Sequence, residues 1–229
     1  MRLLLISDIH ANKEALDAVL KVPHDEVFCL GDIADYGPSP SECIALIREN
    51  NIETVLGNHD AAVGTGIDCG CGYKYKHLSI ATREYTWNFL AEDHLSFLRQ
   101  LPFKAEKVLN GQRLYFTHGS PQSNYEYIRP ETPDDEVAEM IKGIDADFIF
   151  TGHSHQPMVR EVNGIMIINP GSVGQPRDLN PLASCAVFNT ETRDTEIIRC
   201  SYDIENTCNK IRERMPNAEE LISILMRGY

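Results

Sequence analysis

Five short segments of the sequence combine aspartate, asparagine and histidine in patterns that suit metal ligation. They are Asp8-Ile9-His10, Gly31-Asp32, Gly57-Asn58-His59-Asp60, His118 and Gly152-His153-Ser154-His155. Carboxylate, amide and imidazole donors without a thiolate favour manganese, iron or zinc, and they argue against a structural cysteine site. Together they offer more donors than one ion needs. The set instead suits two ions roughly 3.5 to 4 Å apart that share a carboxylate, an arrangement used for phosphoryl displacement.

Taken one at a time, these motifs have simpler explanations. Asn and Asp adopt turn conformations readily, and an isolated histidine at a strand end commonly lies at the surface. The metal interpretation depends on all five motifs, each of which directly follows a predicted strand. Those strands are predicted at 2–6, 26–30, 52–56, 113–117 and 147–151. Because ligands bind at the carboxyl ends of strands in α/β sheets, the five segments should meet in one crevice.

The other predicted elements come from hydrophobic periodicity and turn signals. Helices are predicted at 11–21, 39–50, 78–99, 134–143 and from 203 to the end. Asn110-Gly111 and Asn163-Gly164 are typical of hairpin turns, which predicts strand pairs at 105–109 with 113–117 and at 158–162 with 165–168, and strands also at 183–189 and 195–200. The glycine-rich stretch 61–76 indicates a loop or cap. We expect a single domain over 1–229, with a specificity segment at 61–99 that carries Lys74, Lys76 and Arg83.

Composition limits the partners that this chain can have. Its 229 residues include 21 lysines and arginines against 34 acidic residues, a formal charge of −13. Binding of long nucleic acids by bulk charge needs the opposite balance and is not expected. No apolar run approaches the roughly 20 residues that span a bilayer, and no signal peptide is expected. We therefore expect a cytoplasmic protein with no membrane partner, which could form a homo-oligomer.

The seven cysteines show no paired framework of the kind that small secreted domains use. Cys69 and Cys71 are a close pair, but a single intervening residue does not match the usual zinc spacing. We interpret them as free thiols in a loop rather than as a metal or redox site. His24, His77 and His94 lie outside the motifs and are expected to be structural.

The order of the motifs, Asp-x-His, Gly-Asp, Gly-Asn-His-Asp, His and Gly-His-x-His, resembles the calcineurin-like metallophosphoesterase superfamily. The similarity covers residues 8–155, and the stretch 169–177 (Asn-Pro-Gly-Ser-Val-Gly-Gln-Pro-Arg) resembles small prokaryotic members of a phosphodiesterase-like branch. The resemblance implies an α/β fold, a four-layer α/β/β/α sandwich of two mixed sheets flanked by helices. It also implies a phosphoesterase with two divalent ions as cofactors. Manganese is the expected ion, with iron, zinc or nickel as alternatives.

The resemblance further implies a role for each motif residue. Asp8, His10 and His155 would bind the first ion, Asp32 would bridge, and Asn58, His118 and His153 would bind the second. A hydroxide shared by the ions would attack phosphorus while His59 protonates the leaving oxygen. Asp35 matches the acid that orients this histidine in related phosphatases.

One position departs from the protein Ser/Thr phosphatase branch, in which an arginine follows the second aspartate. Here the residue is Tyr36, so the bidentate phosphate clamp of an arginine is absent. Arg177 could replace it and, with Asn58, contact a small phosphate-containing substrate, or it could merely pair with Asp178. The missing arginine favours a small phosphodiester or phosphoanhydride over a phosphomonoester or phosphoprotein. A catalytically inactive scaffold of the same fold is the alternative from a different class.

Overall fold

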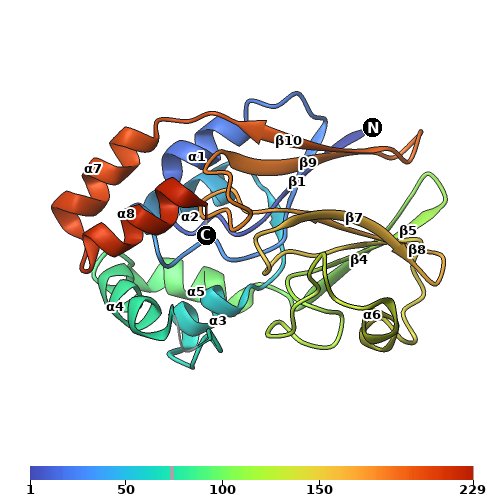
Figure 1. Cartoon of the computed structure of the whole chain (residues 1–229), viewed down its shortest axis with the longest axis horizontal. Helices are drawn as coiled ribbons and strands as arrows, with labels where there is room; N and C mark the ends of the chain where they lie inside the picture. Colours follow the sequence, from blue (N-terminus) through green and yellow to red (C-terminus); the bar gives the residue numbers. More distant parts are fainter. Residues whose placement is uncertain (73–74, 229) are drawn as a thin grey trace.

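Two five-stranded mixed sheets and eight helices form the part of the chain that the computed structural model describes, residues 1–72 and 75–228 (Figure 1). In spatial order, the first sheet contains β10 (Thr195–Cys200), β9 (Ala183–Asn189), β1 (Arg2–Ile6), β2 (Glu26–Cys29) and β3 (Glu53–Thr54). The second contains β4 (Lys104–Leu109), β5 (Gln112–Thr117), β6 (Phe148–Phe150), β8 (Ile165–Pro170) and β7 (Pro157–Val162). β1, β2 and β3 are parallel, as are β5, β6 and β8, whereas β9, β10, β4 and β7 pair antiparallel.

The helices are α1 (Lys13–Val19), α2 (Pro40–Glu49), α3 (Asn58–Thr65), α4 (Lys76–Trp87), α5 (Glu92–Gln100), α6 (Asp134–Met140), α7 (Ile204–Arg214) and α8 (Ala218–Arg227). Both predicted Asn-Gly hairpins are present, and the strands at 183–189 and 195–200 have their predicted bounds. The latter two strands, β9 and β10, pair with each other and belong to the first sheet, where β9 runs antiparallel to β1. The two halves of the sequence therefore share a sheet.

Three predictions about helices were wrong. The loop predicted at 61–76 begins only at Gly66, because α3 continues through the buried residues Ala61, Ala62, Val63 and Gly64 as far as Thr65. The predicted helix at 78–99 is two helices, α4 and α5, and it begins at residue 76. The C-terminal helix is interrupted at Pro216, which cannot continue a helix and holds Met215 in an extended conformation.

The four predicted layers follow from the way β1 divides its side chains. Leu4 and Ile6 pack with residues of α1 and α2, whereas Leu3 and Leu5 pack between the two sheets. Alternate side chains of a strand point to opposite faces, so a strand covered on both faces is a continuous apolar run. On the far side of the second sheet, α6 packs Val137 against residues of β6 and β8 (Figure 1). The α/β/β/α sandwich is confirmed.

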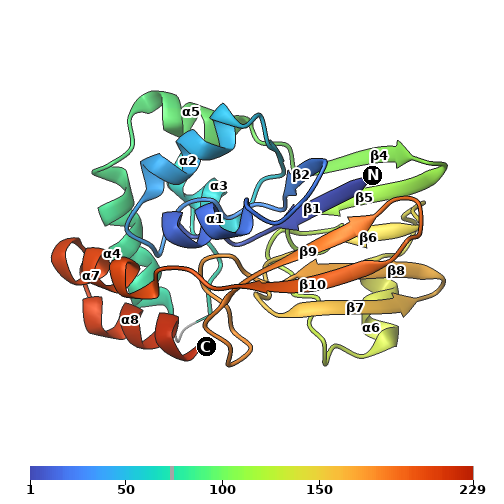
Figure 2. The ribbon, with the colours of Figure 1, turned by 90° about the horizontal axis from the view of Figure 1, so that it is seen from above.

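The C-terminal helices cover one end of the molecule. Figure 2 shows α7 and α8 beside α4, away from the hairpin turns. Leu221 and Leu225 of α8 share an apolar cluster with Leu78 of α4 and with Tyr36, in the loop after β2. None of the helices described is long and apolar enough to cross a membrane.

Aromatic rings fill the space between the sheets, which allows a test of the sandwich. Phe116 is fully buried, and its ring centroid lies 3.9 Å from that of Phe28 and 4.9 Å from that of Phe150. Phe116→Ala should lower the free energy of unfolding by about 3 to 5 kcal/mol, because it leaves a cavity between closely packed rings. Urea unfolding at a fixed metal concentration measures this, since bound ligands add to apparent stability.

Val108→Ala is the control, because this side chain is 70% exposed. It should change the free energy of unfolding by less than about 0.5 kcal/mol. A loss below about 1 kcal/mol for Phe116→Ala would contradict the importance of the aromatic layer.

Candidate metal centre

All five motifs meet at one end of the two sheets, where the parallel strands finish. The segments that carry them follow β1, β2, β3, β5 and β6, and their donor residues are buried. The donors form two groups, Asp8 with His10 and His155, and Asp32 with His118 and His153. Within each group, one potential ligand atom of each residue lies within 4.8 Å of the others. The predicted convergence of the five motifs is therefore confirmed.

The first group is packed as closely as the ligands of a single ion. His155 Nε2 lies 3.2 Å from Asp8 Oδ1 and 3.1 Å from His10 Nε2. Two nitrogens bound at right angles to one metal, at about 2.0 to 2.1 Å, are about 3 Å apart. The observed separations are therefore those of neighbouring ligands.

The second group lies against the first through Asp32. His118 Nε2 lies 2.9 Å from Asn58 Oδ1 and 3.3 Å from Asp32 Oδ2. Asp32 Oδ2 is also 3.8 Å from His10 Nε2 of the first group. The Asn58 amide is oriented by its other end, because Nδ2 donates to the Cys69 carbonyl at 2.6 Å. Asp32 Oδ2 thus lies between residues of the two groups.

Backbone carbonyls orient three of the imidazoles. The Nδ1 atoms of His10, His118 and His155 lie 3.3, 2.7 and 2.6 Å from the carbonyl oxygens of Ala34, Leu30 and Gln175, respectively. When Nδ1 donates its proton to a carbonyl, Nε2 becomes the atom available to a metal. In each of the three residues, Nε2 faces the other donors.

Burial and neighbouring charges favour the protonation states in which histidine and aspartate can bind a metal. Burial lowers the pKa of His10, His153 and His155, which favours the neutral imidazole that keeps a lone pair. Burial alone would raise the pKa of the Asp8 and Asp32 carboxyl groups. The nearby imidazoles of His155 and His118 outweigh it, and both pKa values are lowered.

His118 differs from the other histidines of the two groups. Burial opposes its charged form, but the Asp32 carboxylate outweighs burial and raises the pKa of His118 to about 9. A proton therefore competes with a cation for this imidazole, so metal binding should release it.

Three buried atoms of the two groups lack a hydrogen-bond partner among the described residues. They are Asp8 Oδ1, Asp32 Oδ2 and His153 Nε2. Leaving a buried polar atom unsatisfied costs about 1 to 3 kcal/mol, and more when it is charged. Each of these atoms is an acceptor that a divalent cation could satisfy. The residues present therefore fit the metal ions that the motifs predict.

The backbone is unusual at the same residues. Asp8, His10, Asp32, His153 and His155 have φ angles of 53°, 45°, 57°, 63° and 59°. Such left-handed conformations cost non-glycine residues about 1 to 3 kcal/mol each, and they cluster at functional sites. Gly57 is required beside them, because a Cβ there would overlap the Asp32 carboxylate and its backbone nitrogen. The backbones of the two loops therefore approach closely at this point.

Two supports of this backbone had no role in the sequence prediction. Asp60 accepts hydrogen bonds from the amides of Asp32 and Ile33, at 2.7 and 2.9 Å. Burial and, next, the charge of Asp32 raise the pKa of Asp60 to about 7. In the stretch 169–177, the Ser172 hydroxyl donates to the Asp8 carbonyl at 2.7 Å. Both contacts join segments distant in sequence, which a local motif does not reveal.

His59 lies beside the two groups and is held by Asp35. The distance between His59 Nδ1 and Asp35 Oδ2 is 2.8 Å. The other oxygen of Asp35 accepts hydrogen bonds from the Thr82 hydroxyl and the Tyr36 amide. Burial lowers the pKa of His59, but the Asp32 charge and the bond to Asp35 outweigh burial and raise it. The site can therefore keep a protonated imidazole, the form that a general acid needs.

Cys69 and Cys71 are joined by a disulfide, so their interpretation as free thiols was wrong. Gly70, at a φ angle of 70°, allows the chain to turn back between them. Cys71 Sγ lies 4.0 Å from His59 Nε2, and the Tyr36 hydroxyl lies 3.6 Å from the same sulfur. The disulfide thus forms a wall beside His59.

Arg177 lies at the edge of the site and does not pair with Asp178. Asp178 pairs instead with Arg199. The Arg177 guanidinium donates to Gln175 Oε1 at 2.7 Å, and its backbone amide donates to the His155 carbonyl at 3.3 Å. After burial, its charge is the main cause of the lowered pKa of His155. The positive charge of Arg177 therefore disfavours protonation of His155, a member of the first ligand group.

Two of the cations expected to determine specificity, Lys76 and Arg83, make contacts within the cap. Lys76 pairs with Asp68, and Arg83 donates to the Ile67 carbonyl, both at exposed positions. Lys74 lies outside the described residues. The described cations of the cap are thus tied to its own surface.

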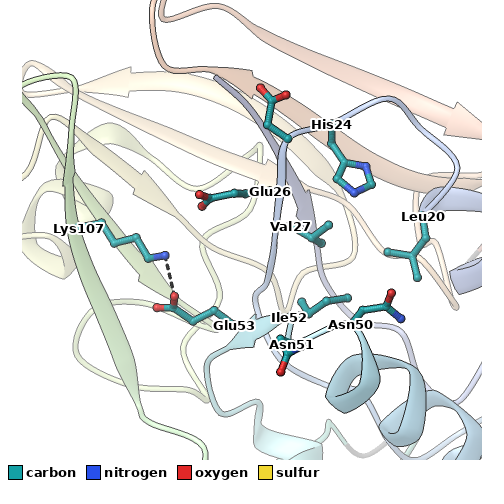
Figure 3. Close-up of a pocket in the computed structure, with 10 residues that line it drawn as sticks. Leu20, His24, Glu26, Val27, Asn50, Asn51, Ile52, Glu53 and Lys107 are labelled. Carbon is teal, nitrogen blue, oxygen red and sulfur yellow. Dashed lines mark ion pairs between the residues drawn. The ribbon is translucent and has the colours of Figure 1, made fainter.

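A separate hollow of about 350 Å³ lies at the opposite end of β2 (Figure 3). His24 and Glu26 line it, and Glu53 pairs there with Lys107. None of the described residues that line it belongs to a metal motif. It is distinct from the ligand groups.

Paired groups of potential metal ligands at the strand ends of an α/β/β/α sandwich are the arrangement expected of a metal-dependent phosphoesterase. A model of the calcineurin-like phosphoesterase superfamily domain matches residues 1–193, and the chain belongs to this family. The protein is therefore a hydrolase of phosphoric esters.

The similarity to other proteins extends over nearly the whole chain. An uncharacterized protein of Methanocaldococcus jannaschii is 37% identical over 234 residues, which cover 93% of each chain. The crystal structure of a metallophosphoesterase from Sphaerobacter thermophilus is similar with a TM-score of 0.81 at 33% identity, covering 100% of this chain and 99% of that one. A hypothetical protein from Pyrococcus horikoshii OT3 shares the fold with a TM-score of 0.87 at 23% identity, covering 100% and 98%.

Metal binding should stabilise the folded chain, because the unfolded chain lacks the assembled groups. A divalent ion at 100 times its dissociation constant adds about 2.7 kcal/mol. For a chain of this size we expect manganese to raise the melting temperature by about 5 to 10 °C. Asp32→Ala should remove at least half of this increase, measured by thermal unfolding with and without manganese.

Asp145→Ala is the matched control, because it also removes one carboxylate, 83% exposed. It should retain the full increase. An unchanged increase in Asp32→Ala would contradict the position of Asp32 between the groups. The increase, rather than the baseline temperature, is compared because alanine at a positive φ angle is itself destabilising.

Proposed function

We propose that the protein hydrolyses a small phosphodiester or phosphoanhydride at a centre of two divalent ions, with His59 as general acid. The proposal rests chiefly on the two ligand groups that flank Asp32 beside the His59–Asp35 pair. Asp8, His10 and His155 would hold one ion, Asn58, His118 and His153 the other, and Asp32 both. Bound ions would supply the positive charge that activates water and neutralises phosphoryl oxygens. Manganese suits this oxygen and nitrogen donor set.

The residues around His59 support its role as the proton donor. Asp35 fixes the ring through Nδ1, which leaves Nε2 to carry a proton to the leaving oxygen. Asp35 is itself fixed by Thr82 and by the Tyr36 amide, so the imidazole is held by a rigid partner. Because His59 is only 5% exposed, water competes little for its proton.

The surroundings of the ligand groups favour a small substrate. All the donors are buried. A hollow of about 350 Å³ adjoins them, lined by Tyr127 and Arg177 among others, and it is not the hollow of Figure 3. It has room for a small molecule rather than for a folded protein surface. Tyr36 packs its ring 5.0 Å from that of His10 and 4.7 Å from that of His59. An apolar ring at this position favours a phosphorus of lower charge than a monoester dianion. A phosphomonoesterase is the second candidate, supported by the cation of Arg177 near the first group.

His59→Ala should retain both ions but lose about 10² to 10⁴ in kcat, the usual contribution of a positioned acid. The loss should be greater for an ester with a more basic leaving group, because such a group depends more on protonation. Steady-state kinetics with two esters that differ only in the leaving group measure this, with metal content determined in parallel.

His24→Ala is the control, since it removes a histidine at the opposite end of β2. Full activity of His59→Ala, or a loss in kcat that is equal for the two esters, would rule out the role of His59 as general acid.

The substrate class can be tested with the manganese-loaded protein. In a parallel assay of an aryl phosphate, a bis-aryl phosphate, a cyclic nucleotide and a dinucleoside tetraphosphate, we expect a diester or an anhydride to have the highest kcat/KM. A strong preference for the monoester would favour the second candidate. Metal uptake without hydrolysis of any of them would instead indicate an inactive scaffold.

A further inference from the structure

The hollow beside the ligand groups is lined by two arginines and by aromatic residues. The described residues that line it include Tyr75, Tyr127, Arg129, Gln156 and Arg177. Tyr127 connects it to the second group, because its ring stacks on that of His153 at a centroid distance of 3.8 Å. Arg177 connects it to the first through the backbone bond to His155. The hollow therefore adjoins both groups.

Two guanidinium groups at this hollow have no carboxylate partner within the part of the chain that the structure describes. They belong to Arg129 and Arg177. The composition makes this unexpected, since 34 acidic residues face 21 basic ones. Six other arginines do pair with acids: Arg48, Arg99, Arg113, Arg160, Arg199 and Arg212. One acidic residue, the exposed Glu131, also lines the hollow, so the two guanidinium groups leave it net positive.

Aromatic rings support both cations. Arg129 Cζ lies 4.1 Å from the centroid of the Tyr127 ring, and Arg177 Cζ lies 5.2 Å from that of Tyr75. A guanidinium group over a ring is held in place while its N–H donors remain available at its edge. One of these donors, Arg177 Nε, is buried without a hydrogen-bond partner. An anion in the hollow would pair with the two guanidinium groups, whereas an alkyl or aryl group offers them neither charge nor a hydrogen-bond acceptor.

We infer that the hollow binds a second anionic group of the substrate, a phosphate joined through oxygen to the phosphorus that is attacked. The inference rests on the proposed function and narrows it to phosphoanhydrides, such as a nucleoside diphosphate or a dinucleoside polyphosphate. A neutral alkyl or aryl group in the same place would leave both guanidinium groups without a counter-charge.

The reaction balances as a hydrolysis. The oxygen of water bonds to the attacked phosphorus and keeps one hydrogen. The bond from that phosphorus to the bridging oxygen breaks, and the leaving phosphate takes the electron pair together with the proton from His59. The second proton of water restores His59. Arg129 and Arg177 stabilise the negative charge that develops on the leaving phosphate.

Substitution of either arginine should change the preference between substrates. In Arg177→Gln and in Arg129→Gln, kcat/KM for diadenosine tetraphosphate should fall about tenfold further than kcat/KM for bis(p-nitrophenyl) phosphate, which offers no second phosphate. Arg2→Gln is the control, because it removes an equal charge at the far end of β1. Its substrate preference should match that of the unaltered protein.

Binding provides a readout that does not depend on turnover. With manganese present, calorimetry should show that both arginine variants bind the α,β-methylene analogue of ADP about tenfold more weakly, with a smaller change for inorganic phosphate. An equal loss for both probes, or no loss for either, would overturn the second-anion site. If the second-anion site were overturned in this way while the protein still hydrolysed the bis-aryl ester, the proposed metal centre would remain supported. Absence of all hydrolysis by the unaltered, manganese-loaded protein would instead refute the proposed function.

Discussion

The Asp32 carboxylate is the interaction on which the rest of the site depends. One oxygen accepts the His59 amide at 2.8 Å, which fixes the start of α3, and the other lies between the two ligand groups. Its charge raises the pKa of His59 and His118, and after burial it also raises that of Asp60. Gly57 leaves the space in which this carboxylate sits. A single buried negative charge thus links the end of β2, the beginning of a helix and the protonation of the histidines, so the parts of the site form together.

The parts that could be predicted are those in which neighbouring residues carry the signal. β1 is a continuous apolar run, the Asn-Gly pairs mark hairpin turns, and each ligand motif directly follows its strand. The parts that could not be predicted depend on contacts across the fold. Thr82 reaches Asp35 from α4, and Tyr127 stacks on His153 from the segment after β5, without any local pattern at either residue. The disulfide was missed because cysteine counting addresses frameworks of several bridges rather than a pair separated by a single residue.

The C-terminal helices extend the family domain, which ends at residue 193, and they reach the site indirectly. α7 and α8 pack on Tyr36, whose ring adjoins those of His10 and His59. In this chain the ring occupies the position where related protein phosphatases carry a phosphate-binding arginine. The helices therefore support the centre through Tyr36, while the cation of Arg129 lies on the Tyr127 ring that stacks on His153, and Arg177 bonds to the backbone of His155.

The left-handed backbone at the ligand residues limits how this centre can be altered. Asparagine and glycine adopt positive φ angles readily, whereas β-branched residues do so rarely. At Asp8 and Asp32, with φ angles of 53° and 57°, the replacement that the chain accepts with least strain is therefore the isosteric amide. Amide replacements would change the charge of the centre in single units while the loops keep their shape. Metal preference could thus be tuned, by selection or by an engineer, without refolding the ends of the strands.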